Sequence, residues 1–271
     1  MNFTKHIQYK PNKQIWRILI TDDDNVVIEK RDTSDKQVYF DSFDLENREK
    51  IFADLQLEEK YWIGIEKIYK GVIYFHLFEK PDMPGHKEII AYDISKREIL
   101  WRDEEHSYLF LYDDKVYCFK ELFEGRHFFA LDYKTGEIVK DLKTDAEKVN
   151  SIYDESRHKE DYSTYTFPET TAPKDKKVDS ILEEFKSTLD IVGNVEYNVF
   201  ENTLLASYHT KETGNNMTNK FLAVDIDSGK EILSQTLSQN VDSFMVDSFF
   251  VYKNFLFLLK GKDEVVIYKI E

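Results

Sequence analysis

A strand–turn–strand phrase that recurs along the chain limits the possible folds more than any other feature of the sequence. Each full copy has alternating apolar residues, an aspartate, a glycine or arginine four residues later, and an isoleucine that starts the next strand. Aspartate tolerates turn geometry, and glycine supplies the positive φ of a tight turn. Full copies lie at 40–52, 88–101, 128–139 and 221–233, and a truncated copy lies at 264–270. The phrase predicts antiparallel β-structure.

A second phrase, made of a strand, a two-residue turn and another strand, precedes most of these copies. Its turns lie at 70–71, 113–114, 201–202 and 253–254. Together the two phrases make a four-stranded antiparallel unit of roughly 40–50 residues, which is the size of a β-propeller blade. The sequence therefore predicts an all-β fold, a β-propeller of four-stranded blades forming a single domain over 1–271.

The spacing of the repeats predicts the number of blades. Equivalent positions at 44, 93, 132, 225 and 269 are separated by 49, 39, 93 and 44 residues. Because 93 is about twice the other intervals, we expect six blades, five regular and one irregular at 143–190, with five blades as the alternative. The segment 13–17 resembles the outer-strand phrase at 97–102, so we expect this N-terminal strand to complete the last blade.

The hydrophobic-Asp-x-x-x-Gly-x-Ile phrase resembles the repeats of quinoprotein-like β-propellers, the pyrroloquinoline-quinone (PQQ) repeat type. The whole chain resembles an uncharacterised bacterial propeller family of unknown function. This resemblance implies a fold and carries over no activity. The tryptophan ring of quinoprotein dehydrogenases is not evident among Trp16, Trp62 and Trp101, and a single cysteine cannot form a vicinal pair. We therefore expect neither PQQ nor another cofactor.

The segment 143–190 departs from the repeat. Residues 161–167 alternate and could form a strand, and 168–177 read as a loop. Apolar residues at 178, 181, 182, 185 and 189 predict an amphipathic helix opened by Asp179 or Ser180, with an outer strand at 181–185 as the alternative. A long insertion in a repeat scaffold is either a functional element or a solvated decoration.

Composition excludes several classes of function. The formal charge is −15, from 37 Lys and Arg against 52 Asp and Glu, and would repel a nucleic-acid backbone. No apolar run is long enough for a membrane helix, and the N-terminus lacks the apolar core of a secretory signal, so we expect no membrane partner and a cytoplasmic location unless a leader has been removed. The single cysteine, Cys118, lies in an apolar strand phrase, and we expect it to be buried and inert.

Candidate binding residues follow from the predicted topology. Loops between blades converge at the two ends of a ring, and the end with longer, polar loops should carry 79–87, 103–107, 120–127, 209–220 and part of 143–190. An arginine there offers a bidentate fork to a carboxylate or phosphate, with ordinary pairing to surface acids as the alternative. The predicted ligand-binding residues are Arg126, His127, His106, His86, His209, Arg157 and His158, with Arg126 as the anchor of an anionic group.

Metal binding is not predicted. The histidines come from separate blades without HxH or HExxH spacing, so we interpret them as histidines that fall in polar loops. The acidic runs 22–25 and 225–229 lack the full twelve-residue calcium pattern and are interpreted as turns. Asp93, Asp132 and Asp225 recur at one place in each unit, which favours a structural role.

No phosphate-binding glycine loop, nucleophile elbow or ordered catalytic triad is present in the sequence. The favoured hypothesis is a non-catalytic binding or scaffold propeller that recognises a protein or a small anionic ligand through one loop face. The alternative is a propeller enzyme, a hydrolase or lyase, with its site at the channel mouth. Fold alone does not decide between them.

Overall fold

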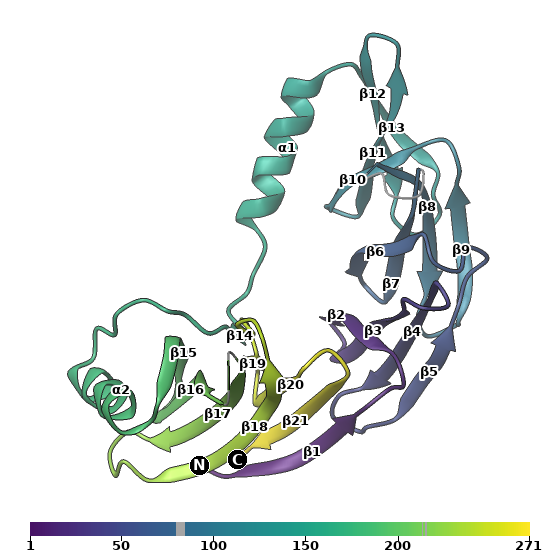
Figure 1. Cartoon of the computed structure of the whole chain (residues 1–271). Helices are drawn as coiled ribbons and strands as arrows, with labels where there is room; N and C mark the ends of the chain where they lie inside the picture. Colours follow the sequence, from purple (N-terminus) through teal and green to yellow (C-terminus); the bar gives the residue numbers. More distant parts are fainter. Residues whose placement is uncertain (80–84, 213, 215) are drawn as a thin grey trace. The chain divides into compact units, whose positions relative to one another are not determined.

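The computed structural model describes residues 1–79, 85–212, 214 and 216–271, which form two compact units (Figure 1). One unit is residues 13–160, and the other combines residues 1–12 with 161–271. The described residues contain five antiparallel sheets, three in the first unit and two in the second. The predicted all-β class with four-stranded antiparallel units is confirmed.

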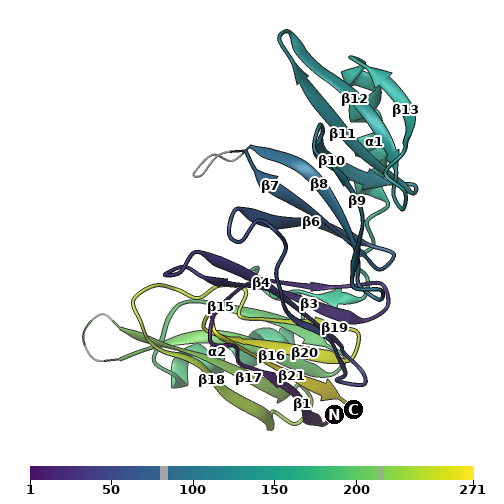
Figure 2. The ribbon, with the colours of Figure 1, turned by 90° about the vertical axis from the view of Figure 1, so that its right-hand side faces the viewer.

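The unit of residues 13–160 holds three four-stranded sheets in chain order, followed by one helix (Figure 2). The first sheet is β2 (Gln14–Ile20), β3 (Asn25–Asp32), β4 (Gln37–Asp44) and β5 (Lys50–Leu55). The second is β6 (Ile63–Tyr69), β7 (Val72–Phe78), β8 (His86–Asp93) and β9 (Glu98–Asp103). The third is β10 (Ser107–Tyr112), β11 (Lys115–Leu122), β12 (Gly125–Asp132) and β13 (Ile138–Lys143), and α1 (Ala146–His158) follows it.

The other unit holds two sheets and one helix. One sheet is β15 (Ile191–Phe200), β16 (Thr203–Lys211), β17 (Met217–Asp225) and β18 (Glu231–Val241), preceded in the chain by α2 (Lys176–Thr188). The other has the order β1 (Phe3–Tyr9), β21 (Glu264–Ile270), β20 (Phe255–Lys260), β19 (Phe249–Tyr252) and β14 (Tyr165–Thr166).

Within residues 13–160, the sheets pack face to face. One apolar cluster joins sheet β2–β5 to sheet β6–β9 and includes the fully buried Val27, Phe40 and Phe75. A second cluster joins sheet β6–β9 to sheet β10–β13 and includes Tyr74 and Val116, both fully buried. Burial of each large apolar side chain stabilises the fold by about 1.5–3 kcal/mol. Both faces of the middle sheet therefore pack against a neighbouring sheet, which explains why strands such as β7 read as apolar runs.

The repeated turn has the same geometry in four sheets. The backbone N–H groups of Arg48, Arg97, Gly136 and Gly229 each donate to the carbonyl of the aspartate four residues earlier, at 2.8–3.0 Å. All four residues have a positive φ, between 60° and 74°. Glycine adopts this conformation without cost, whereas arginine adopts it at some cost.

The predicted structural role of the turn aspartates is confirmed. The Oδ1 atom of Asp93 accepts from the backbone N–H of Lys96 at 2.8 Å, and that of Asp225 accepts from the backbone N–H of Ser228 at 2.8 Å. The acidic run 22–25 is also a turn, as predicted, because the N–H of Thr21 donates to the carbonyl of Asn25 at 2.9 Å.

The segment 143–190 forms no four-stranded sheet, so the expected sixth, irregular blade is wrong. The segment holds α1, α2 and the two-residue strand β14 instead. Its sequence has no glycine between Gly136 and Gly193, so it lacks the glycine of the repeated turn, and its apolar residues have helical spacing. The amphipathic helix predicted at 178–189 is confirmed as α2, but Asp175 caps it rather than Asp179 or Ser180, accepting from the backbone N–H of Lys177 at 2.7 Å.

The N-terminal strand that completes the last sheet is β1, which pairs antiparallel with β21 from Phe3 opposite Ile270 to Tyr9 opposite Val265. The expectation that 13–17 would supply this strand is wrong. Gln14–Ile20 is instead the first strand of the first sheet, paired with β3. The resemblance to 97–102 reflects only the apolar pattern common to edge strands.

We predict that Asp132→Ala lowers the free energy of unfolding by about 0.5–2 kcal/mol, the range for loss of a capping side chain. The Oδ1 atom of Asp132 accepts from the backbone N–H groups of Lys134 and Thr135 at 2.9 and 2.8 Å. Chemical denaturation of the variant measures the loss. Lys134→Ala is the matched control, since only the backbone of Lys134 takes part, and an equal loss in both variants would contradict the prediction.

Candidate functional site

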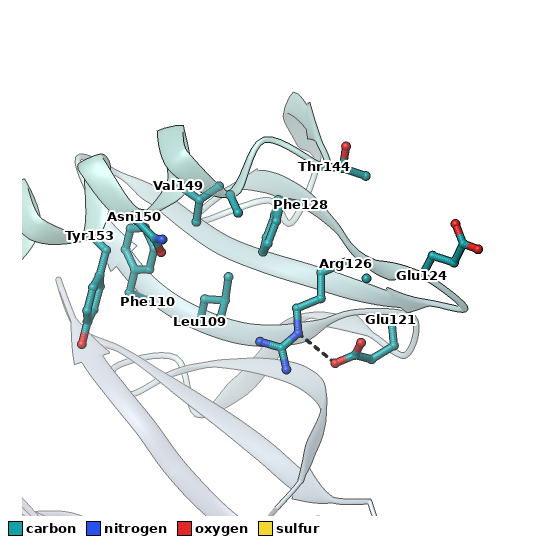
Figure 3. Close-up of a pocket in the computed structure, with 12 residues that line it drawn as sticks. Leu109, Phe110, Glu121, Glu124, Arg126, Phe128, Thr144, Val149, Asn150 and Tyr153 are labelled. Atoms are coloured by element: carbon teal, nitrogen blue, oxygen red, sulfur yellow. Dashed lines mark hydrogen bonds and ion pairs between the residues drawn. The ribbon is translucent and has the colours of Figure 1, made fainter.

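A cavity of about 730 Å³ lies between α1 and the sheet β10–β13, within residues 13–160 (Figure 3). Strand β10 contributes Leu109 and Phe110, and β12 contributes Arg126 and Phe128. Its other lining residues come from the β11–β12 hairpin, from α1 and from the second residue before α1: Glu121, Glu124, Gly125, Thr144, Ala146, Val149, Asn150 and Tyr153. The cavity thus has an apolar floor and a charged edge.

Helix α1 forms one wall of this cavity because its apolar side chains have helical spacing. Asp145 caps the helix by accepting from the backbone N–H of Lys148 at 3.0 Å. Val149 is buried against the sheet cluster that includes Phe110, and Ile152 packs on the same cluster. Tyr153 lies one residue further and its ring is 5.2 Å from that of Phe110.

Arg126 lies at the charged edge of the cavity, half exposed (Figure 3). Its Nε donates to the Oε1 atom of Glu121 at 2.9 Å, and its guanidinium lies 4.1 Å from the centre of the Phe119 ring. Within the described part of the chain, the two terminal nitrogens of Arg126 donate no hydrogen bond. Arg126 is therefore held in place on one side and open to an anion on the other.

Two of the predicted histidines lie close to one aromatic ring of the same sheet. The His127 ring stacks on Phe129 with centroids 4.3 Å apart, and the buried His106 meets Phe129 edge to face at 4.6 Å. His127 Nε2 lies 2.6 Å from Asp141 Oδ1. Both imidazoles are thus already in contact with Phe129, and neither is among the residues that line the cavity.

His86 belongs to a different cluster, in the sheet β6–β9. Its Nδ1 lies 2.6 Å from the Oε1 atom of Glu66, and its ring stacks on His76 with centroids 3.5 Å apart. Burial alone would raise the pKa of Glu66, but the two neighbouring imidazoles, His76 and His86, lower it to about 2. Burial lowers the pKa of His76.

The remaining predicted residues lie apart from these groups. His209 is in the other unit, where it is buried beside a cavity of about 230 Å³ and accepts from the backbone N–H of Met245 at 3.0 Å. Burial lowers the pKa of His209. Arg157 and His158 are exposed in the last turn of α1, and the Arg157 guanidinium lies 6.0 Å from the centre of the Tyr153 ring.

The interpretation of these histidines as residues of polar loops is wrong for four of the five. His86, His127 and His209 lie in strands β8, β12 and β16, and His158 is the last residue of α1. The expected loop at 120–127 is a tight hairpin, in which Leu122 pairs with Gly125. Part of the expected loop at 79–87, residues 80–84, lies outside the described residues.

Two groups of residues that line or form the candidate sites were not predicted from the sequence. The helix α1 was not predicted, although Val149, Ile152 and Tyr153 have helical spacing after a capping aspartate. Glu66 and His76 were not singled out, because no short motif joins them. Their meeting depends on strand register, which the sequence leaves open.

Cys118 is buried, as predicted, and burial raises the pKa of its thiol. Neither helix of the described residues is long and apolar enough to cross a membrane.

Comparisons with known proteins leave the activity open. Residues 20–101 match the model of a family described as a domain of unknown function, DUF4905. No curated protein matches the sequence.

Several solved structures are similar at low identity. One is a member of the DUF4221 family from Bacteroides vulgatus (10% identity, 100% of this chain and 98% of that chain, TM-score 0.34). Another is a europium-containing methanol dehydrogenase, with 12% identity and a TM-score of 0.34. The match covers 96% of this chain and 52% of that chain, so this chain spans about half the length of the dehydrogenase. A third is the β-propeller domain of the Trilobed protease from Pyrococcus furiosus, with 11% identity and a TM-score of 0.32. The match covers 96% of this chain and 69% of that chain.

We predict that Asp103→Asn lowers stability at neutral pH and has little effect in acid. Asp103 Oδ2 lies 2.8 Å from His106 Nδ1. Burial alone would raise the pKa of Asp103, but this bond and the backbone N–H groups of Glu105 and His106 lower it below 3.8. The ionised carboxylate therefore stabilises the fold above pH 3.8, and this contribution is lost as the pH falls through the folded-state pKa.

Urea unfolding between pH 7 and pH 3 checks this prediction. The free-energy difference between wild type and Asp103→Asn should shrink as the pH falls below 3.8. The exposed neighbour Glu104 gives the control, Glu104→Gln. A difference for Asp103→Asn that stays constant across the range would argue against the assignment.

Proposed function

We propose that this protein is a non-catalytic binding module of the β-propeller type, whose five sheets are the blades. It takes a small ligand with an apolar body and one acidic group into the cavity between α1 and the sheet β10–β13. The proposal of a propeller rests on four-stranded antiparallel sheets that follow one another in the chain, and on an N-terminal strand that completes the last sheet.

The position of Arg126 is the observation that carries the proposed ligand chemistry. A guanidinium held through Nε by Glu121 presents its terminal nitrogens as a fork, the geometry that binds a carboxylate or phosphate. The floor beside it is formed by Leu109, Phe110 and Phe128. Burial of an apolar body on this floor would favour binding, while the acidic group of the ligand pairs with Arg126.

A catalytic role has less support from the same residues. The lining residues of the cavity include no histidine and no cysteine, and Thr144 has no imidazole beside it among them. Nucleophilic catalysis needs a nucleophile with a base within hydrogen-bond reach. A hydrolase that uses a serine, threonine or cysteine nucleophile would lack that pair at this cavity, so binding is the better account.

We predict that Arg126→Ala weakens binding of an amphipathic carboxylate by about 1.5–3 kcal/mol, the range for a hydrogen bond to a charged group. A panel of aromatic and aliphatic carboxylates, each with its uncharged amide, is screened by thermal shift, and the binders are titrated by calorimetry. Arg102→Ala is the matched control, because Arg102 is also ion-paired, to Glu88 at 2.7 Å, but lies in β9. Amides that bind as well as acids, or equal losses in both variants, would overturn the proposal.

We also predict that Ala146→Trp abolishes binding of the same carboxylates without lowering the melting temperature. Ala146 is an exposed residue of the first turn of α1 that lines the cavity, so an indole there occupies the space of the ligand body. The variant leaves Arg126 and Glu121 unchanged, and it therefore tests the cavity separately from the charge. Undiminished affinity in Ala146→Trp would place the carboxylate elsewhere on the protein.

A further inference from the structure

Three potential metal ligands meet on adjacent strands of the sheet β6–β9. Glu66 comes from β6, His76 from β7 and His86 from β8. One ligand atom from each lies within 4.8 Å of the other two. The Oε1 atom of Glu66 lies 2.6 Å from Nδ1 of His86 and 3.0 Å from Nδ1 of His76.

His76 is the residue of this cluster whose buried ring nitrogens are not satisfied by hydrogen bonds among the described residues. It is 3% exposed, and neither ring nitrogen has a correctly oriented hydrogen-bond partner in the described parts of the chain, although Nδ1 lies near Glu66. A buried polar group without a partner costs free energy that an apolar ring of similar size would not cost. A ligand that engages a ring nitrogen would remove this cost.

The backbone makes room for the His76 ring. Gly64 lies opposite His76 in the β6–β7 pair, and a Cβ atom there would lie only 2.8 Å from Cε1 of His76. Glu66 is the extra residue of a β-bulge, since Ile65 pairs with Phe75 while Lys67 pairs with Tyr74. Bulges re-aim side chains, and this one accompanies the approach of Glu66 to the two imidazoles.

We propose that Glu66, His76 and His86 bind a divalent first-row transition metal ion of the Zn²⁺ type. Two imidazoles and one carboxylate are a common ligand set for Zn²⁺, and three protein ligands leave a position for water or an exogenous group. The Arg126 cavity lies in a different sheet, so this site is independent of the proposed ligand-binding function.

Metal binding requires the two imidazoles to tilt apart. Their rings are stacked with an interplanar angle of 7°, whereas the lone pair of each nitrogen lies in its ring plane. The His86 side chain is 35% exposed and has room to turn, while that of His76 is 4% exposed and is confined beside Gly64. His86 is therefore the side chain that moves onto the ion.

The test uses the full chain, stripped of metal by a chelator and dialysed. Zn²⁺ is titrated by calorimetry, and Co²⁺ is followed by its visible absorption, which reports nitrogen and oxygen ligation. We expect one ion per chain. His86→Ala and Glu66→Gln should each weaken Zn²⁺ binding by roughly 100-fold or more, because loss of even an outer-shell partner costs about 10–100-fold.

His127→Ala is the matched control, because His127 also pairs with a carboxylate, Asp141 at 2.6 Å, without a second imidazole beside it. This variant and Arg126→Ala should bind Zn²⁺ like the wild type. His76→Phe should lose the ion yet melt no lower than the metal-free wild type, since it removes two buried nitrogens that lack a correctly oriented hydrogen-bond partner in the described chain.

Circular dichroism checks that each variant is folded. If one of His86→Ala, Glu66→Gln and His76→Phe does not fold, the other two carry the comparison. Absence of Zn²⁺ binding in the wild type would overturn the proposal. So would an affinity that His76→Phe and His86→Ala leave unchanged, or one that His127→Ala lowers as much as His86→Ala does.

Discussion

Face-to-face packing of four-stranded sheets is the constraint on which the rest of this structure depends. A sheet such as β6–β9 buries apolar residues on both faces, Phe75 on one and Tyr74 on the other, so it needs a neighbour on each side. A sheet with a neighbour on one side only must cover its other face differently. Helix α1 does this for the sheet β10–β13, and α2 does it for the sheet β15–β18. The irregular segment therefore supplies packing surfaces where a sheet was expected.

The parts of the fold that depend on local chemistry could be predicted from the sequence. The turn after Asp132 is set by the aspartate side chain and by Gly136 four residues later, both visible in the sequence. Two-residue hairpin turns such as Asp113-Asp114, with φ of 49° and 59°, are equally local. The helix α1 was missed because its charged residues outnumber its apolar ones, and only contact with Phe110 shows why it is helical.

The candidate sites depend on which strand lies beside which, and this is why sequence reasoning found only part of them. Arg126 was predicted, because an arginine in an acidic chain stands out. Its apolar floor was not, because Leu109 and Phe128 become neighbours only through pairing in the sheet. The metal site was predicted to be absent, because Glu66 and His76 are ten residues apart and show no motif.

A bulge in the first strand of each sheet of residues 13–160 is one reason why sequence reasoning did not find all residues of the candidate sites. In β2, β6 and β10 one extra residue stands between two paired ones: Trp16, Glu66 and Leu109. The Arg31 guanidinium lies 5.1 Å from the Trp16 ring, Glu66 joins the histidine cluster, and Leu109 lines the Arg126 cavity. A bulged residue is released from pairing and points where the regular alternation would not send it. The same position in the three sheets therefore carries side chains of different chemistry. The repeat predicts the fold, but it does not predict which residue of each copy is bulged or what that residue contacts.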